Sequence, residues 1–384
     1  MKPLLQRLMH KATQLTRRGN LQEATRVIQR ALNGVMSAEP ARPDPAPPPT
    51  HAANDDRLVI DVEARFVEPA PKVAPGIKPY FAPDLRREAL PEAAPETGTE
   101  QWSDGLFAHQ HRTIAYKLFV PVKGEGTARP LVLMLHGCTQ HPEDFATGTQ
   151  MNRLAREHGF LVLYPAQTQH ANSSKCWNWF KPQHQQRERG EPALLAALTQ
   201  SVMSEHDVDP ARVYVAGLSA GGAMADILGQ THPDLFAAVG VHSGVPAGAA
   251  INLVSALAVM KSGQRAVAGD RPRVPTIVFH GDADITVNPR NGEQVVAAAL
   301  AGHNGAAAQM QTSSGQSAKG RAFTRQVHAD TQGRPTVEYW VLHGSGHAWS
   351  GGHPLGSFTD PDGPDASAEM LRFFLNHGHP PVTH

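Results

Sequence analysis

The sequence feature that most constrains the fold is a serine between two glycines, Gly217-Leu218-Ser219-Ala220-Gly221. Residues 212–216 before it are apolar and rich in β-branched side chains, which predicts a buried strand. Residues 222–228 after it have the composition of a helix. A tight turn from strand to helix would hold Ser219 at the carboxyl end of the strand and near the positive end of the helix. This setting indicates a nucleophile elbow, and the alternative is an ordinary glycine-rich turn.

Residues 101–384 alternate between apolar runs of strand length and segments with helical spacing. Strands are predicted at 113–120, 130–135, 160–164, 212–216, 237–241, 276–279 and 337–342. Helices are predicted at 142–158, 193–205, 222–228, 252–260, 292–300 and 366–374. Such alternation predicts an α/β fold with a doubly wound, mostly parallel sheet. Ligands of such sheets bind beyond the carboxyl ends of the strands.

Three of these strand ends carry side chains with useful chemistry. The strand at 130–135 is followed by His136-Gly137-Cys138-Thr139. The backbone N–H groups of Cys138 or Thr139, together with that of Ala220, are candidates for an oxyanion hole.

The two other strand ends supply an acid and a base, Asp284 and His347. The order Ser219, Asp284, His347 is the order that α/β-hydrolases use. His347 would take the proton of Ser219, and Asp284 would hold the imidazole in one tautomer and stabilise its charged form.

Asp282 competes with Asp284 for the role of the acid. Asp284 is followed by Ile285 and Val287, which are expected to bury its loop under the site. Water around a triad acid would weaken its hold on the imidazole. We therefore assign the acid to Asp284 and a loop-bonding role to Asp282.

Several other residues are candidates for the lining of the site. Trp177, Trp179 and Trp349 lie in predicted loops, so we expect an aromatic platform for substrate rather than ordinary core. His242 follows a strand and is expected to line the pocket. His136 and His280 each precede a glycine at a strand end and are interpreted as structural.

Five stretches resemble the polyhydroxybutyrate depolymerase family of esterases, which is related to feruloyl and acetylxylan esterases. They are residues 135–140, 176–180, 215–222, 280–284 and 346–352. The resemblance implies an α/β-hydrolase with the triad Ser219, Asp284 and His347, acting on short-chain polyhydroxyalkanoate esters without a cofactor. It also places Cys138 beside Cys176, which favours a disulfide between them over two reduced thiols.

The front of the chain differs from the rest. Residues 1–35 are predicted to form a helical hairpin that packs on itself or on the main domain, with contact to a surface or granule through residues 3–33 as the alternative. Thirteen of the 32 prolines lie within 36–100, which predicts an extended, largely disordered linker before a catalytic domain at 101–384. The N-terminus lacks the continuous apolar core of a secretory signal, whereas the resembled family is usually secreted, so an extracellular and a cytoplasmic location both stay open.

Composition narrows the function classes. The 35 basic residues balance the 35 acidic ones, so no strong field favours nucleic acid or an anionic membrane, and no apolar run has the length of a membrane span. Neither His-Glu-x-x-His nor paired Cys-x-x-Cys occurs, so no metal site is predicted among the 21 histidines. The prediction is a serine esterase for polyester or its oligomers, with a feruloyl- or acetylxylan-type carboxylesterase and a non-catalytic, surface-recruited binding module as alternatives.

Overall fold

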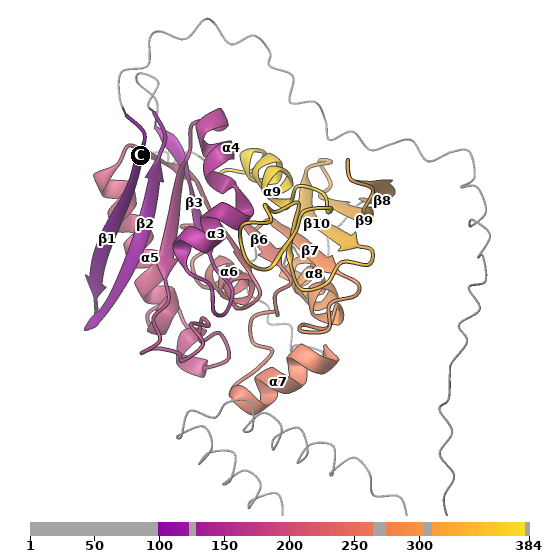
Figure 1. Ribbon diagram of the computed structural model, residues 1–384, viewed down its shortest axis with the longest axis horizontal. Coiled ribbons are helices and arrows are strands. Elements are labelled where there is room, and N and C mark those ends of the chain that lie inside the picture. Colours follow the sequence, from indigo (N-terminus) through magenta and orange to yellow (C-terminus); the bar gives the residue numbers. More distant parts are fainter. Residues whose placement is uncertain (1–98, 123–127, 264–273, 303–308, 381–384) are drawn as a thin grey trace, which may run out of the picture. The chain divides into compact units, whose positions relative to one another are not determined.

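A computed structural model describes residues 99–122, 128–263, 274–302 and 309–380 (Figure 1). Ten strands form one sheet in the order β1-β2-β4-β3-β5-β6-β7-β10-β9-β8, and β11 pairs with β12 separately. The strands are β1 (Gln101–His109), β2 (Arg112–Val120), β3 (Arg129–Leu135), β4 (Leu161–Ala166), β5 (Val208–Leu218), β6 (Ala238–His242), β7 (Thr276–Gly281), β8 (Gln309–Gln316), β9 (Ala322–Ala329), β10 (Pro335–Leu342), β11 (Trp349–Ser350) and β12 (Thr359–Asp360). The helices are α3 (Pro142–Thr149), α4 (Met151–His158), α5 (Gly190–Glu205), α6 (Ala220–Thr231), α7 (Leu253–Ser262), α8 (Arg290–Gly302) and α9 (Ala366–Leu375), with a 3₁₀ turn η1 (Pro182–His184).

The middle of the sheet is parallel and buried. Strands β4, β3, β5, β6, β7 and β10 run in one direction. Every residue of β3, β6 and β7 is buried, in agreement with their continuous apolar runs. The strand order and the parallel centre identify the fold as an α/β-hydrolase, as the alternation of strands and helices predicted.

Helices cover both faces of the sheet and divide the core into two layers. Side chains of α5, α6 and α8 pack with Leu131, Leu133 and Leu135 of β3 on one face. Side chains of α3, α4 and α9 pack with Val132 and Met134 on the other face. Because neighbouring residues of a strand point to opposite faces, β3 contributes to both layers. The carboxyl ends of the parallel strands meet at the lower edge of the sheet in Figure 1, and α7 lies below that edge.

Two expectations about the elements were wrong. The segment 142–158 forms two helices rather than one, because Gln150 adopts a left-handed conformation with φ 53°. Its N–H closes α3 on the carbonyl of Ala146, and the chain then turns into α4. The antiparallel strands β1, β8 and β9 at the sheet edges were not predicted.

The predicted hairpin at 1–35 and nearly all of the predicted linker at 36–100 lie outside the described residues. Strand β1 begins at Gln101, the expected start of the catalytic domain. Across the described ranges, none of the helices combines the length and apolar character that crossing a bilayer requires.

Candidate active site

Ser219 lies on the sharp turn between β5 and α6. Its backbone has φ 57° and ψ −117°, a conformation that residues other than glycine rarely adopt. The turn packs closely against β3, since a Cβ on Gly221 would overlap the carbonyl oxygen of Leu135. The N–H of Ser219 donates to the carbonyl of His242 on β6 at 2.9 Å. These contacts fix the half-buried Ser219 at the carboxyl edge of the sheet.

Asp284 and His347 form a sheltered pair at the same edge. The distance from Nδ1 of His347 to Oδ2 of Asp284 is 2.7 Å, and the side chains are 11% and 0% exposed. The other carboxylate oxygen of Asp284 accepts hydrogen bonds from the backbone N–H groups of Thr286 and Val287. Because Asp284 accepts at Nδ1, the imidazole presents Nε2 as the site that can receive a proton.

The carboxyl group of Asp284 is held in its ionised form. Burial raises the pKa of Asp284. Hydrogen bonds from His280 and His347 lower it by more than burial raises it, so the pKa of Asp284 lies well below its usual range. His280 lies behind the acid, with Nε2 3.5 Å from Oδ2 of Asp284 and 2.9 Å from the carbonyl of Val287. The sequence analysis interpreted His280 as structural but did not foresee its contact with the acid.

Asp282 pairs with a different histidine. Its carboxylate lies 2.8 Å from Nδ1 of His343 and accepts from the N–H of Gly344, and both side chains of the pair are 42% exposed. Asp282 therefore joins two loops at the surface, as a loop-bonding residue would. The expectation for the shelter of Asp284 was half wrong: Val287 is buried, but Ile285 is 96% exposed.

Ser219 and His347 belong to the same edge but are not hydrogen-bonded to each other in this structure. The carbonyl of His242 accepts from the N–H of Ser219, and Nε2 of His242 accepts at 3.0 Å from the N–H of Ser350, three residues after His347. Hydrogen bonds between a nucleophile and its base often tighten only when substrate binds. The elbow serine and the loop that bears His347 are thus both attached to His242, the first through its backbone and the second through its ring.

One of the expected oxyanion donors is occupied. The N–H of Thr139 donates to the carbonyl of Ser174 at 2.7 Å, so the assignment of Thr139 is corrected. Among the described residues, the N–H of Cys138 donates no hydrogen bond. Ala220 is the first residue of α6, where an N–H has no partner within the helix. Cys138 and Ala220 therefore stay as the candidates.

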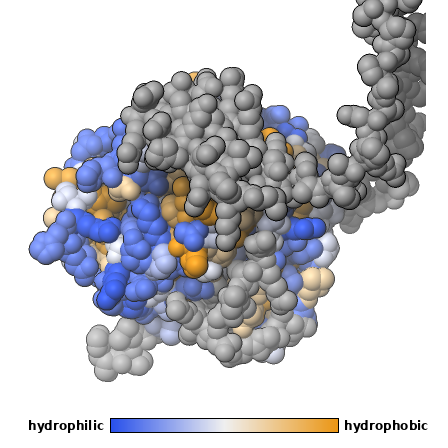
Figure 2. All heavy atoms as spheres, turned by 90° about the horizontal axis from the view of Figure 1, so that it is seen from below, coloured by the Kyte–Doolittle hydropathy of each residue, from blue (hydrophilic) through white to orange (hydrophobic). Residues whose placement is uncertain are grey.

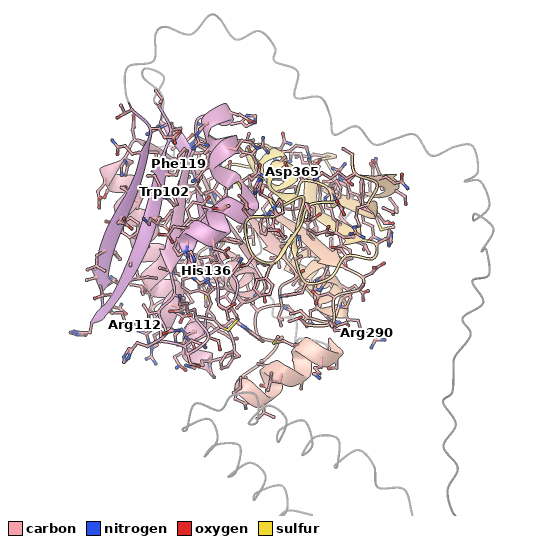
Figure 3. All side chains as sticks on the ribbon, viewed as in Figure 1. Trp102, Arg112, Phe119, His136, Arg290 and Asp365 are labelled. Carbon is pink, nitrogen blue, oxygen red and sulfur yellow. A yellow bond between two sulfur atoms is a disulfide. The ribbon has the colours of Figure 1, made fainter. Side chains whose placement is uncertain are left out.

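A disulfide joins the oxyanion loop to the aromatic loop. Cys138 and Cys176 are bonded, with their Cα atoms 4.2 Å apart, and the bond is drawn in yellow below the His136 label in Figure 3. The indole N–H of Trp177 donates to the carbonyl of His136, and the N–H of Gln167 donates to Nε2 of His136. The loop that bears Cys138 is thus held from two sides.

The expected aromatic platform is absent. Trp177, Trp179 and Trp349 are 0%, 6% and 1% exposed, so their faces are not available to a substrate. Trp349 packs on Phe145 and His242, and its indole N–H donates to Ser367. These tryptophans belong to the core because their loops fold back over the sheet. The position of a loop in the sequence does not show whether its side chains are buried.

His242 is also corrected, because it is completely buried and does not line the pocket. Burial lowers the pKa of His242 well below its usual value, with a further contribution from the neighbouring His280 and His347. Its neutral ring accepts at Nε2 from Ser350, so its part is to support the site from below.

Apolar side chains on the same edge escaped the sequence analysis. Ile251, Leu253, Val254 and Leu257, at and before the start of α7, are 66%, 59%, 73% and 47% exposed. Figure 2 looks onto this edge and shows apolar residues among polar ones. The run Ile251-Asn252-Leu253-Val254 was the available signal, but the prediction of a helix at 252–260 did not say which of its apolar side chains are exposed. In the described ranges no group of three or more His, Cys, Asp or Glu side chains could hold a metal ion.

Comparison with known proteins identifies the family of the chain. The family model described as Esterase PHB depolymerase matches residues 114–318, which is more than half of the chain. The chain belongs to the Esterase PHB depolymerase family. The matched range contains Ser219 and Asp284, whereas His347 lies beyond its end.

The curated proteins that resemble this chain include polyester and polysaccharide esterases. Poly(3-hydroxyalkanoate) depolymerase C of Paucimonas lemoignei is 33% identical over 234 residues, covering 57% of this chain and 54% of that protein. Acetylxylan esterase A of Talaromyces purpureogenus is 30% identical over 215 residues, covering 50% and 54%. The chain spans about half the length of these curated relatives.

A solved structure supports the fold. The acetyl xylan esterase from Aspergillus awamori superposes with a TM-score of 0.57 and 19% identity, covering 73% of this chain and all of that one. At this identity the likeness establishes the α/β-hydrolase fold of the family member and nothing about its substrate.

Proposed function

We propose that the protein is a serine carboxylic ester hydrolase. The observation that carries the proposal is the sheltered pair of Asp284 and His347 beside the strained elbow of Ser219. A buried carboxylate on Nδ1 leaves Nε2 as the base that a serine nucleophile requires. Membership of an esterase family supports the same reaction.

The mechanism follows from these positions. His347 removes the proton of Ser219 as the hydroxyl oxygen attacks the ester carbonyl, and the N–H groups of Cys138 and Ala220 stabilise the oxyanion. Collapse of the tetrahedral intermediate breaks the bond to the alkoxy oxygen, and His347 protonates the departing alcohol. Water, activated by His347, then cleaves the acyl-enzyme and releases a carboxylic acid.

The substrate class that we propose is the ester bond of short-chain poly(3-hydroxyalkanoates) or their oligomers. The support is the family and the 33% identity to a poly(3-hydroxyalkanoate) depolymerase. Exposed aliphatic side chains at the start of α7, on the edge that bears Ser219, suit an apolar polyester better than a sugar.

A second candidate is a feruloyl- or acetylxylan-type esterase. Its support is the 30% identity to an acetylxylan esterase. The chemistry at Ser219 would be the same, and only the groups on either side of the ester would differ.

A panel of esters separates these candidates. Initial rates would be measured on a 3-hydroxybutyrate trimer, a polyhydroxybutyrate film, acetylated xylan and methyl ferulate. We expect turnover of the trimer with the highest kcat/KM, and Ser219→Ala should lower kcat by about 10⁶. Preference for acetylated xylan would favour the second candidate. Near-normal turnover by Ser219→Ala would refute the enzyme mechanism altogether.

A further inference from the structure

A cavity lies at the carboxyl edge of the sheet, separate from the triad of Ser219, Asp284 and His347. Its volume is about 610 Å³, and none of the three triad residues lines it. Its walls come from residues 111–114 at the start of β2, 166–168 at the end of β4, the loop before η1, and the first turns of α5. The carboxyl end of a parallel strand is where sheets of this kind bind ligands.

Two cations line this cavity, and neither forms an ion pair among the described residues. Arg112 is exposed at the start of β2, and Lys181 is half-buried just before η1. Within the part of the chain that the structure describes, neither side chain pairs with a carboxylate. Two unpaired cations that line one cavity favour an anionic ligand, and a guanidinium suits a carboxylate in particular.

Among the described residues, Glu191 is the only carboxylate that lines the cavity, and the protein already satisfies its hydrogen bonds. One of its oxygens accepts from Gln167 at 2.7 Å and from the side-chain amide of Asn178 at 2.6 Å, and the other accepts from the N–H of Asn178 at 2.7 Å. Burial raises the pKa of Glu191. Hydrogen bonds from His184 and Asn178 lower it by more than burial raises it, so Glu191 stays ionised. Glu191 is 3% exposed, so its carboxylate is buried below the cavity surface and surrounded by these hydrogen-bond donors.

The remaining lining of the cavity mixes polar and apolar side chains, with Thr168, Gln183 and His184 among the polar ones. Ile114 and Leu194 contribute small apolar areas, since they are 4% and 6% exposed. A ligand that fills it would therefore combine an acid group near Arg112 and Lys181 with a short chain that carries a further polar group, such as a hydroxyl.

We propose that this cavity is a second binding site for a short-chain carboxylate. Its natural ligand, in this proposal, is the hydroxy acid that ester hydrolysis releases at the same edge, and this identification rests on the proposed function. The wall of the cavity is tied to the oxyanion loop, because Trp177 and Gln167 both hydrogen-bond to His136 and Cys176 is bonded to Cys138.

Calorimetric titration of the Ser219→Ala protein tests the site without turnover. The probes are 3-hydroxybutyrate and its neutral counterpart 3-hydroxybutyramide. We expect the acid to bind more tightly than the amide. Arg112→Gln combined with Lys181→Gln should weaken binding of the acid about tenfold or more and leave the amide unaffected, because a hydrogen bond to a charged group contributes about 1.5–3 kcal/mol.

Arg290→Gln is the matched control. Arg290 is an exposed arginine on the same edge, on the far side of His136 from Arg112 (Figure 3). Its replacement should leave the affinity for the acid unchanged. Absence of binding, equal affinity for acid and amide, or an unchanged affinity in the double variant would each overturn the proposal. Because binding is read without hydrolysis, these results are independent of the ester panel that tests the proposed function.

Discussion

Two acid–histidine pairs lie side by side at the end of β7, and their surroundings assign them different roles. The pair of Asp284 and His347 is sheltered, whereas the pair of Asp282 and His343 is open to water. Solvent weakens a charge interaction by its high dielectric constant, so only the sheltered carboxylate can hold an imidazole firmly. The two pairs therefore provide a matched comparison within one molecule.

Asp284→Asn should lower kcat by about 10⁴, because an amide no longer enforces the tautomer that leaves Nε2 as a base. Asp282→Asn should lower kcat much less, since its carboxylate contacts His343 and Gly344 rather than His347. Steady-state kinetics on a soluble ester, with circular dichroism to verify folding, measure both. The reverse ranking in two folded variants would identify Asp282 as the acid.

Buried neutral histidines should make the fold sensitive to moderate acid. Burial lowers the pKa of His136 and of His232 to about 4, and it also lowers the pKa of His242 well below its usual value. In the unfolded chain histidine titrates near 6.5, so between about pH 6.5 and pH 4 the unfolded state binds more protons than the folded state. The free energy of unfolding should therefore fall as the pH falls through this window.

Urea unfolding at a series of pH values measures this effect. His232→Gln, whose side chain cannot take up a proton, should make the dependence shallower. A free energy of unfolding that stays constant from pH 6.5 to pH 4 would contradict the assignment of these histidines as buried and neutral.

At the residue scale, sequence patterns located the chemistry better than its surroundings. Ser219, Asp284 and His347 were predicted because each follows a recognisable strand end, and strand ends converge at one edge of the sheet. The conformation of Thr139 and the burial of Trp177 and Trp349 depend on how loops fold back, which local spacing does not encode.

Among the elements, α7 is distinguished by the exposed apolar side chains of Leu253, Val254 and Leu257. The helix begins with a capping box in which Asn252 and Ser255 satisfy each other's backbone N–H groups. This cap makes the helix locally stable, so its exposed aliphatic side chains need no packing partner to be ordered. The start of α7 is therefore available for contact with an insoluble substrate.

Leu253→Ser combined with Val254→Ser should weaken adsorption to a polyester film by about tenfold or more, because each buried aliphatic side chain contributes about 1.5–3 kcal/mol. Turnover of a soluble ester should not change. Met310→Ser is the control. Met310 is also an exposed apolar residue, at 61%, but it lies on β8, the edge strand of the sheet, and not on α7. Equal adsorption by all three proteins would show that α7 does not contact the polymer.

The elements that the sequence analysis predicted are those with continuous apolar runs, such as β3 and β7. The edge strands were missed because solvent reaches them: most residues of β1 and β8 are exposed, so their polar composition is typical of loops. The break at Gln150 was missed because glutamine is a good helix former whose left-handed conformation is imposed by the surrounding chain.

At the scale of the whole molecule, the described residues hold the complete ten-stranded sheet, both core layers and every proposed catalytic group. Removing residues 1–98 should therefore leave a folded protein with nearly unchanged kcat/KM on a soluble ester. Size-exclusion chromatography and ester kinetics of the shortened chain measure this. An insoluble or unfolded product would show that the front of the chain contributes to the core.

A different result is possible on solid substrate. If the shortened protein keeps its activity on soluble esters but loses it on polymer or granules, residues 3–33 act as a surface anchor. That outcome would favour the alternative that the sequence analysis kept open for this segment.

The most direct test of the central claim is covalent labelling by a serine-directed phosphonate, followed by mass spectrometry of the peptides. The account predicts one modified residue, Ser219, with ester turnover lost in proportion to labelling and with no labelling of the Ser219→Ala protein. An unmodified Ser219 in a protein that still hydrolyses esters, or inactivation through a label on another residue, would contradict it.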